Sequence, residues 1–185
     1  MNAADLTERA RALFEAQNPY PGPALAEHNR RILAFASALG ERRGVAVDAD
    51  LLGAGCWLHD IGLLVPERAE PSYQRRSWRF VAPHAERWGV EPERQQQLRW
   101  MLRYTHSLRP LPGLEPMADL IRRAVQVEHS GGLRRHGLQR GFCRRVFAAH
   151  PRGDLSRILV DFARITLLED GPGQLATLFW PRREY

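Results

Sequence analysis

The feature that most constrains the fold is the spacing of apolar residues, which recur three and four positions apart along most of the chain. This spacing places apolar side chains on one face of an α-helix, whereas a half-buried strand needs strict alternation. No run of alternating β-branched residues lies between turn residues. Proline and glycine separate the helical stretches. The pattern predicts an all-α bundle of about seven to eight helices, over residues 5–16, 24–43, 48–59, 72–88, 91–105, 115–128, 140–149 and 155–169.

The length of 185 residues fits one domain, and 44% hydrophobic residues are enough to form a core. We expect a single domain over residues 1–185, with a core from about 24 to 135 on which the C-terminal helices and the tail pack. The polar start and the shortness of the apolar runs predict a cytoplasmic protein that does not enter a membrane. The sequence leaves the oligomeric state open.

Two aspects of composition bear on the ligands of this chain. Cys56 and Cys143 are too few for a disulfide framework or a thiolate zinc site, and both have apolar neighbours, so we expect buried thiols. The net charge is +6, and all 27 basic residues are arginine, which binds phosphate through two parallel hydrogen bonds. We expect a small anionic substrate. Nucleic-acid binding through the basic segment 134–145 is a weaker alternative, because no aromatic stacking platform accompanies it.

Several polar side chains share the apolar faces of the predicted helices. His28 lies three residues after Leu25 and four before Ile32, so it points inward. The same reasoning turns three further histidines and one glutamate, on other helices, toward the core; they are His59, His84, His106 and Glu128. A single inward histidine is usually a hydrogen-bonded core residue. An inward polar group is costly without partners, however, and these groups satisfy one another most simply around a metal ion.

We therefore predict a site for one or two divalent transition-metal ions. Imidazole and carboxylate ligands together suit Fe, Mn, Zn, Ni or Co better than calcium. Two histidines and one carboxylate leave coordination positions open for substrate or water. The predicted ligands are His28, His59, Asp60, His84, His106 and Glu128.

The stretch Cys56-Trp57-Leu58-His59-Asp60-Ile61-Gly62 resembles the signature of the HD superfamily of metal-dependent phosphohydrolases. In that family the adjacent His and Asp are metal ligands at a helix end, and a further histidine lies about 30 residues upstream, as His28 does here. The segment His106–Pro110 looks like the family's fifth-helix histidine motif, and residues 121–128 resemble the part with the last aspartate. The likeness covers residues 24–135 and implies an all-helical HD fold.

The chain departs from the family pattern at the last metal ligand. The expected aspartate aligns with Val125, which cannot bind a metal. Glu128 lies about one helical turn later and could replace it, while His129, Asp119 and Asp161 are secondary candidates. The resemblance also implies that His84 and His106 match the extra histidines of members with two ions.

The resemblance implies hydrolysis of a phosphate ester of a nucleotide or small metabolite. In this interpretation Asp60, Glu128 and Arg109 form the catalytic group, and Asp60 bridges two ions. Arginines near the site could hold phosphate oxygens; they are Arg31, Arg103, Arg109 and Arg122. Two alternatives stay open: a di-iron oxygenase that cleaves a small organic substrate, and a non-catalytic ligand sensor or binding domain, which Val125 favours.

Overall fold

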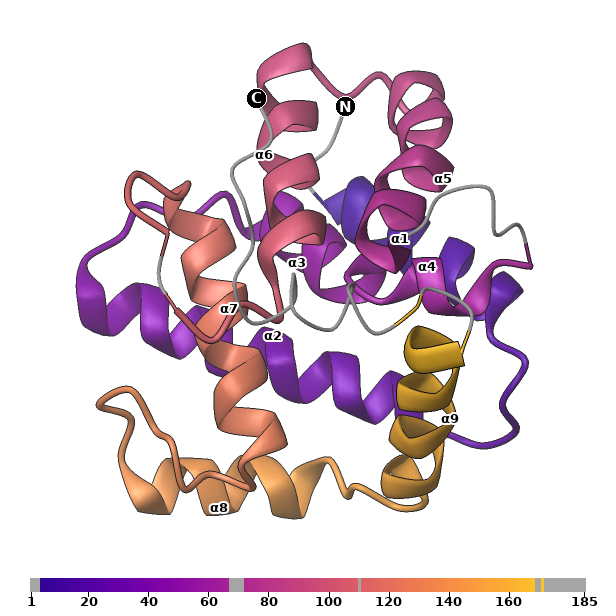
Figure 1. Cartoon of the computed structure of the whole chain (residues 1–185). Coiled ribbons are helices and arrows are strands. Elements are labelled where there is room, and N and C mark those ends of the chain that lie inside the picture. The colour runs from indigo at the N-terminus through magenta and orange to yellow at the C-terminus, as the bar shows by residue number, and fades with distance from the viewer. Residues whose placement is uncertain (1–3, 67–71, 110, 169–170, 172–185) are drawn as a thin grey trace.

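The computed structural model describes residues 4–66, 72–109, 111–168 and 171, and in these residues it contains helices and no strand (Figure 1). The prediction of an all-α fold is therefore confirmed. The helices are α1 (Ala4–Gln17), α2 (Ala24–Arg43), α3 (Ala49–Leu58), α4 (Ile61–Leu64), α5 (Tyr73–Arg87), α6 (Pro92–Tyr104), α7 (Pro116–His129), α8 (Arg140–Ala149) and α9 (Leu155–Leu168).

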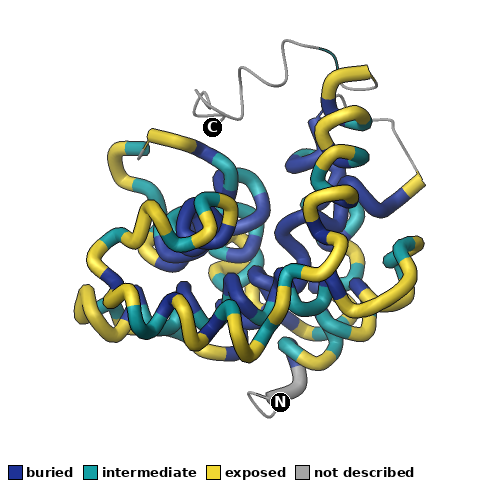
Figure 2. Tube along the Cα trace, turned by 90° about the horizontal axis from the view of Figure 1, so that it is seen from below, coloured by how far each residue is buried: buried dark blue, intermediate teal, exposed yellow. Residues whose placement is uncertain are grey.

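Helix α3 forms the centre of the core and packs against α1, α2, α6 and α7 (Figure 1). Its residues from Asp50 to Leu58 are all buried, as expected of a helix that is apolar on every side. Gly55 allows close packing, because a Cβ at this position would lie 2.8 Å from Sδ of Met101 and 2.9 Å from Cδ1 of Ile121. The exposed parts of the chain lie at the periphery of this arrangement (Figure 2).

Acidic side chains fix the beginnings of the first and third helices. Asp48 is the N-cap of α3 and accepts a hydrogen bond from the backbone nitrogen of Leu51 at 3.0 Å. Asp50 accepts hydrogen bonds from the backbone nitrogens of Leu6 and Thr7, at 3.3 and 2.8 Å. These nitrogens lie in the first turn of α1, where they lack partners within the helix. Asp50 thus joins the start of α1 to α3.

The predicted helices agree with the structure to within one residue at each end, and one further helix is present. The predicted helix 48–59 ends at Leu58, and α4 follows after a break at His59 and Asp60. Four apolar residues are too few for periodicity to indicate a separate helix. Both cysteines are free and buried, as expected. The predicted packing of the tail concerns residues 172–185, which lie outside the described residues.

None of the helices in the described segments combines the length and apolarity that a membrane span requires.

The glycine that follows the His59–Asp60 break lies in direct contact with α5. The backbone nitrogen of Gly62 donates to Oγ of Ser77 at 2.9 Å, and its carbonyl oxygen accepts from Nε of Arg76 at 3.0 Å. A Cβ at this position would overlap the carbonyl oxygen of Tyr73 and lie 2.7 Å from the backbone nitrogen of Ser77. Only glycine therefore allows α4 and α5 to approach this closely.

We expect Gly62→Ala to lower the free energy of unfolding by about 2–3 kcal/mol, because the clash is with backbone that cannot rotate away. Gly141→Ala is the matched control, since Gly141 also lies in a helix and the nearest atom to its added Cβ is Nη1 of Arg145 at 3.7 Å. Gly141→Ala should raise the free energy of unfolding by up to about 1 kcal/mol, because alanine has a higher helix propensity than glycine. Urea unfolding measures the free energy of unfolding of both variants. Equal effects of the two substitutions would contradict the close approach at Gly62.

Candidate metal centre

Four imidazoles form a closed circuit, in which His28 and His59 are buried, His106 is partly buried and His129 is exposed, and two carboxylates lie against it. The ring centroids of His28 and His59 are 5.3 Å apart, and those of His59 and His106 are 5.9 Å apart. His106 and His129 follow at 5.4 Å, and His129 and His28 close the circuit at 5.7 Å. The carboxylates are those of Asp60 and Glu128. These residues come from α2, the α3–α4 break, the turn after α6 and the end of α7.

One group of potential ligands consists of His28, His59 and Asp60. Nδ1 of His59 lies 2.9 Å from the carbonyl oxygen of Cys56, which can only accept, so Nδ1 carries a proton and the neutral imidazole has its lone pair on Nε2. That Nε2 lies 3.1 Å from Oδ2 of Asp60, and Nε2 of His28 lies 4.0 Å from the same oxygen. One ligand atom from each residue falls within 4.8 Å of the others, so the three could hold a metal ion.

The hydrogen bonding of these residues fits such an ion. The buried polar atoms without a hydrogen-bond partner include both ring nitrogens of His28, Nε2 of His59, Oδ1 of Asp60 and Oε2 of Glu128. A buried polar atom without a partner costs about 1–3 kcal/mol, and folded proteins contain few of them. A cation bound by one nitrogen of His28, by Nε2 of His59 and by the carboxylate of Asp60 would remove part of that cost. The mixture of imidazole nitrogen and carboxylate oxygen suits a transition metal.

Glu128 is held by a buried arginine on α2. Its Oε1 accepts from Nε and Nη2 of Arg31 at 3.1 and 2.9 Å, and both side chains are fully buried. Nη1 of Arg31 donates to the carbonyl oxygens of His150 and Pro151 at 2.7 and 2.9 Å. This use of Arg31 leaves it no role in binding phosphate, contrary to the expectation from sequence.

The free oxygen of Glu128 faces the imidazoles. Oε2 lies 3.3 Å from Nδ1 of His28 and 3.7 Å from Nε2 of His129, and these three residues form a second group that could hold a metal ion. The two groups share His28. A neutral imidazole has one lone pair, so a His28 that binds an ion through Nε2 has its proton on Nδ1, facing Glu128. In that arrangement Glu128 orients His28 by accepting its hydrogen bond and does not itself bind the ion.

The surroundings shift the pKa values of these groups. Burial alone would raise the pKa of Asp60, but the His59 and His106 imidazoles hold it far below its usual value. Burial likewise opposes the ionisation of Glu128, yet His28, His129 and Arg31 keep its pKa low. Burial lowers the pKa of His106 to about 4 and that of His129 to about 3, assisted at His129 by the nearby His106. Burial opposes the protonation of His59, but the Asp60 carboxylate raises its pKa above the usual value. At neutral pH the carboxylates are ionised and His106 is uncharged.

Position 125, where the family aspartate was expected, is buried and offers no ligand atom. His129, one helical turn later on α7, brings its ring into the circuit instead. The sequence indicates His129 only as a secondary candidate, although its spacing of four from Val125 places it on the same helix face. The other two secondary candidates, Asp119 and Asp161, belong to neither potential metal group.

His106 lies near Asp60 but is already hydrogen-bonded. Its Nδ1 lies 2.7 Å from the hydroxyl of Tyr73 and 3.8 Å from Oδ1 of Asp60. The turn that contains it is fixed to α7, because the carbonyl oxygen of Ser107 accepts from Nη1 of Arg122 at 3.2 Å and from Nε2 of Gln126 at 2.9 Å. His106 belongs to neither three-ligand group among the described residues.

The structure does not bring His84 to this centre. His84 lies eleven residues after Tyr73 on α5, which corresponds to about 16 Å along the helix. Its ring contacts Phe80 and Trp88, and its Nδ1 lies 3.2 Å from Nη2 of Arg87. The expected second ion at His84 and His106 therefore finds no support in the geometry. Helical periodicity indicated the face of His84 but not its distance from the other histidines.

A pocket of about 320 Å³ lies beside the imidazole circuit, and its lining includes His106 and His129. The arginine expected there, Arg109, is exposed and does not line it, and Arg122 is engaged with Asp119 and Ser107. Arg134, which the sequence did not indicate as a site residue, lines the pocket instead. The remaining lining residues are Leu108, Val125, Gln126 and Ser130.

Comparison of the chain with protein-family models, curated proteins and solved structures found no match. The resemblance to the HD superfamily therefore rests on the residues quoted above. Buried His and Asp side chains that could hold a metal ion are consistent with it.

We expect the protein to bind a divalent transition metal, and His59→Ala and Asp60→Asn to abolish that binding. His84→Ala is the matched control and should bind metal as the wild type does, because His84 lies outside the imidazole circuit. Elemental analysis measures the metal content. It is applied to protein purified without an affinity metal, before and after reconstitution with Mn²⁺, Fe²⁺ or Zn²⁺.

Glu128→Gln separates the two possible roles of Glu128. If Glu128 orients His28, the affinity should fall about 10- to 100-fold while the stoichiometry is kept. Complete loss of the ion in Glu128→Gln would make Glu128 a ligand. Equal metal content in wild type, His59→Ala and Asp60→Asn would contradict the metal centre itself.

The pairing of Asp119 with the arginines of α7 predicts a pH-dependent stability. Burial would raise the pKa of Asp119, but hydrogen bonds from Arg123 and Arg122 at 2.6 Å hold it below its usual value. A carboxyl with a lowered pKa in the folded state stabilises above its unfolded pKa of about 3.9, and this contribution disappears as the pH falls through the folded value. Asp119→Asn should therefore lower the free energy of unfolding by about 2 kcal/mol at pH 7, and by progressively less as the pH falls below about 3.9.

Urea unfolding of wild type and Asp119→Asn across this range measures the difference. The control is Glu8→Gln, because Glu8 pairs with Arg11 at the surface and should change little at any pH. A constant difference between wild type and Asp119→Asn at all pH values would show that the charge of Asp119 is not the cause.

Proposed function

We propose that this chain is an HD-type, metal-dependent phosphohydrolase that acts on a phosphate ester of a nucleotide or small metabolite. The observation that supports this most directly is the convergence of unpartnered, buried ligand atoms from His28, His59 and Asp60. These residues are also the ones that match the HD signature. The adjacent pocket supplies space for a substrate.

The charges of the site favour an anionic substrate. Arg31 offsets the charge of Glu128, so Asp60 is the one remaining negative charge among the groups described around the imidazole circuit. A divalent ion bound there would leave the site with a net positive charge, and it would supply an acidified water and a Lewis acid for a phosphoryl oxygen. Histidines bind a metal ion in their neutral form, so His28 and His59 would hold that ion without cancelling its charge.

The pocket residues suggest how the rest of the substrate is bound. The guanidinium of Arg134 could bind phosphate oxygens through two hydrogen bonds. Leu108 and Val125 give the pocket apolar walls, which suit the organic part of an ester. A volume of about 320 Å³ matches a small molecule and is too small for a polymer. His106 lines the pocket and could accept a proton there, because its pKa of about 4 leaves the imidazole uncharged at neutral pH.

We expect the metal-reconstituted protein to hydrolyse p-nitrophenyl phosphate or bis(p-nitrophenyl) phosphate, with release of p-nitrophenol as the measurement. Asp60→Asn should lower kcat/KM at least about 1,000-fold, which corresponds to about 4 kcal/mol of lost transition-state stabilisation. His84→Ala should retain the wild-type rate. Arg134→Ala should raise KM about tenfold, while Arg135→Ala, an exposed neighbour outside the pocket, should not.

The other two candidate functions give different results in the same preparation. A di-iron oxygenase would bind iron, consume dioxygen and leave the phosphate esters intact. A non-catalytic sensor would show neither activity with any of the metals. Either result would overturn the proposed hydrolase.

A further inference from the structure

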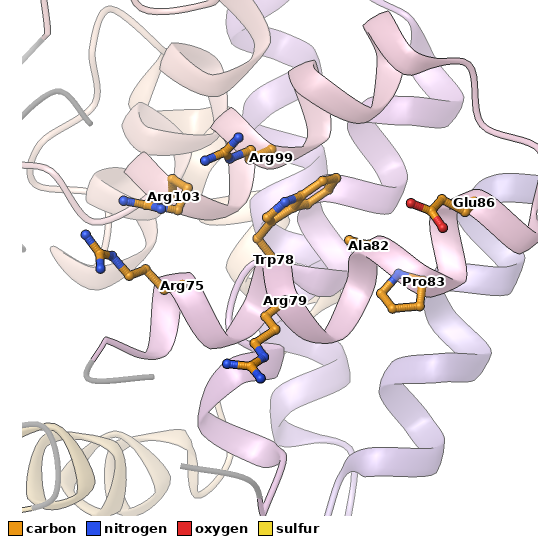
Figure 3. Close-up of a pocket in the computed structure, with 8 residues that line it drawn as sticks. All are labelled: Arg75, Trp78, Arg79, Ala82, Pro83, Glu86, Arg99 and Arg103. Carbon is orange, nitrogen blue, oxygen red and sulfur yellow. The ribbon is translucent and has the colours of Figure 1, made fainter. Parts of the chain in front are cut away.

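A second and larger cavity lies between α5 and α6 and shares no lining residue with the metal centre or its pocket. Its volume is about 570 Å³. Figure 3 shows its lining, with six residues from α5 and two from α6. These are Arg75, Trp78, Arg79, Ala82, Pro83, Glu86, Arg99 and Arg103. We call this cavity the α5–α6 groove.

The groove brings four guanidinium groups together with one carboxylate. The residues from α5 recur three and four positions apart and thus line one face of that helix, and Arg99 and Arg103 are one turn apart on α6. The side chain of Arg99 has no hydrogen bond or ion pair with any described residue. A concave surface with several arginines concentrates anions and binds phosphate groups in particular.

Side chains of different chemical character follow one another along the groove. Figure 3 shows Arg75 and Arg103 at one end, Glu86 at the other end, and the indole of Trp78 between them. Arg75 and Glu86 are eleven residues apart, or about 16 Å along the helix. The Trp78 side chain is partly exposed, so its ring is available to a planar ligand. The order of groups is therefore cationic, aromatic and acidic.

We propose that the α5–α6 groove binds a nucleoside polyphosphate. The phosphates would lie on the arginine-rich side of Trp78, where Arg99 can bind them through two parallel hydrogen bonds and the other guanidinium groups add positive charge. The base would stack on Trp78, an interaction worth about 1–3 kcal/mol per base. Glu86 would accept a hydrogen bond from a hydroxyl or an exocyclic amine of the nucleoside. The volume suits one nucleotide and is too small for a nucleic-acid strand.

This site does not depend on the proposed hydrolase function, because none of its residues belongs to the metal centre. The experiment therefore uses the full-length Asp60→Asn variant, which separates groove binding from turnover. Isothermal titration calorimetry with ADP, adenosine and pyrophosphate compares the whole ligand with its two parts. We expect ADP to bind at least tenfold more tightly than adenosine or pyrophosphate.

Groove variants in the same background locate the binding. Arg99→Gln and Trp78→Phe should each weaken ADP binding, Arg99→Gln by about tenfold or more. Arg87→Gln is the matched control, because Arg87 is on α5 next to Glu86 but does not line the groove. Thermal unfolding of Arg99→Gln should match that of its parent, since the exchange is at a partly exposed position.

Three results would overturn the proposal. The first is ADP affinity unchanged in Arg99→Gln, which would place the nucleotide elsewhere. The second is pyrophosphate binding as tightly as ADP, which would leave no role for Trp78. The third is tighter binding of a single-stranded RNA oligonucleotide than of ADP, which would make the groove part of a nucleic-acid surface.

Discussion

The arrangement of the interior depends on one buried ion pair, between Arg31 of α2 and Glu128 of α7. Burying two charges costs several kcal/mol per ion, so such a pair is favourable only when its remaining hydrogen-bonding groups are satisfied. Arg31 meets this condition by donating to the carbonyl oxygens of His150 and Pro151 as well. The pair thus joins α2 and α7 to the segment between α8 and α9. It also fixes the carboxylate that faces His28, so the geometry of the candidate metal centre depends on it.

Much of the fold and part of the site could be predicted from sequence, for different physical reasons. Helix ends were accurate because apolar periodicity, caps and breakers such as Gly44, with φ of 61°, are local properties. The meeting of His28, His59 and Asp60 could be expected because each is inward and the HD signature relates them. His84 could not be placed from sequence. Periodicity gives the face of a helix on which a residue lies, but not the position along the helix axis at which another helix crosses. The involvement of His129 and Arg134 depends on how the end of α7 packs, which no local signal encodes.

A chemical constraint on one side chain decides how the two potential metal groups relate. His28 belongs to both, but a neutral imidazole offers one lone pair, so occupation of one group by His28 excludes its use in the other. The fixed tautomer of His59 favours the group with Asp60, because its Nε2 is free and points toward that carboxylate. The buried Arg31 favours the same outcome, since it already holds one oxygen of Glu128. Two independent hydrogen-bond arrangements thus select His28, His59 and Asp60.

Gly62, which has no Cβ, influences the candidate metal centre although it is not part of it. Because Gly62 lets α4 lie against the start of α5, the backbone of Tyr73 is held beside the chain that follows Asp60. From that position the hydroxyl of Tyr73 reaches Nδ1 of His106, which in turn faces Asp60. A larger residue at position 62 would push α5 outward and separate Tyr73 from His106. The glycine of the His-Asp-Ile-Gly stretch therefore acts on the site through packing, by setting the distance between α4 and α5 and with it the position of Tyr73 beside His106.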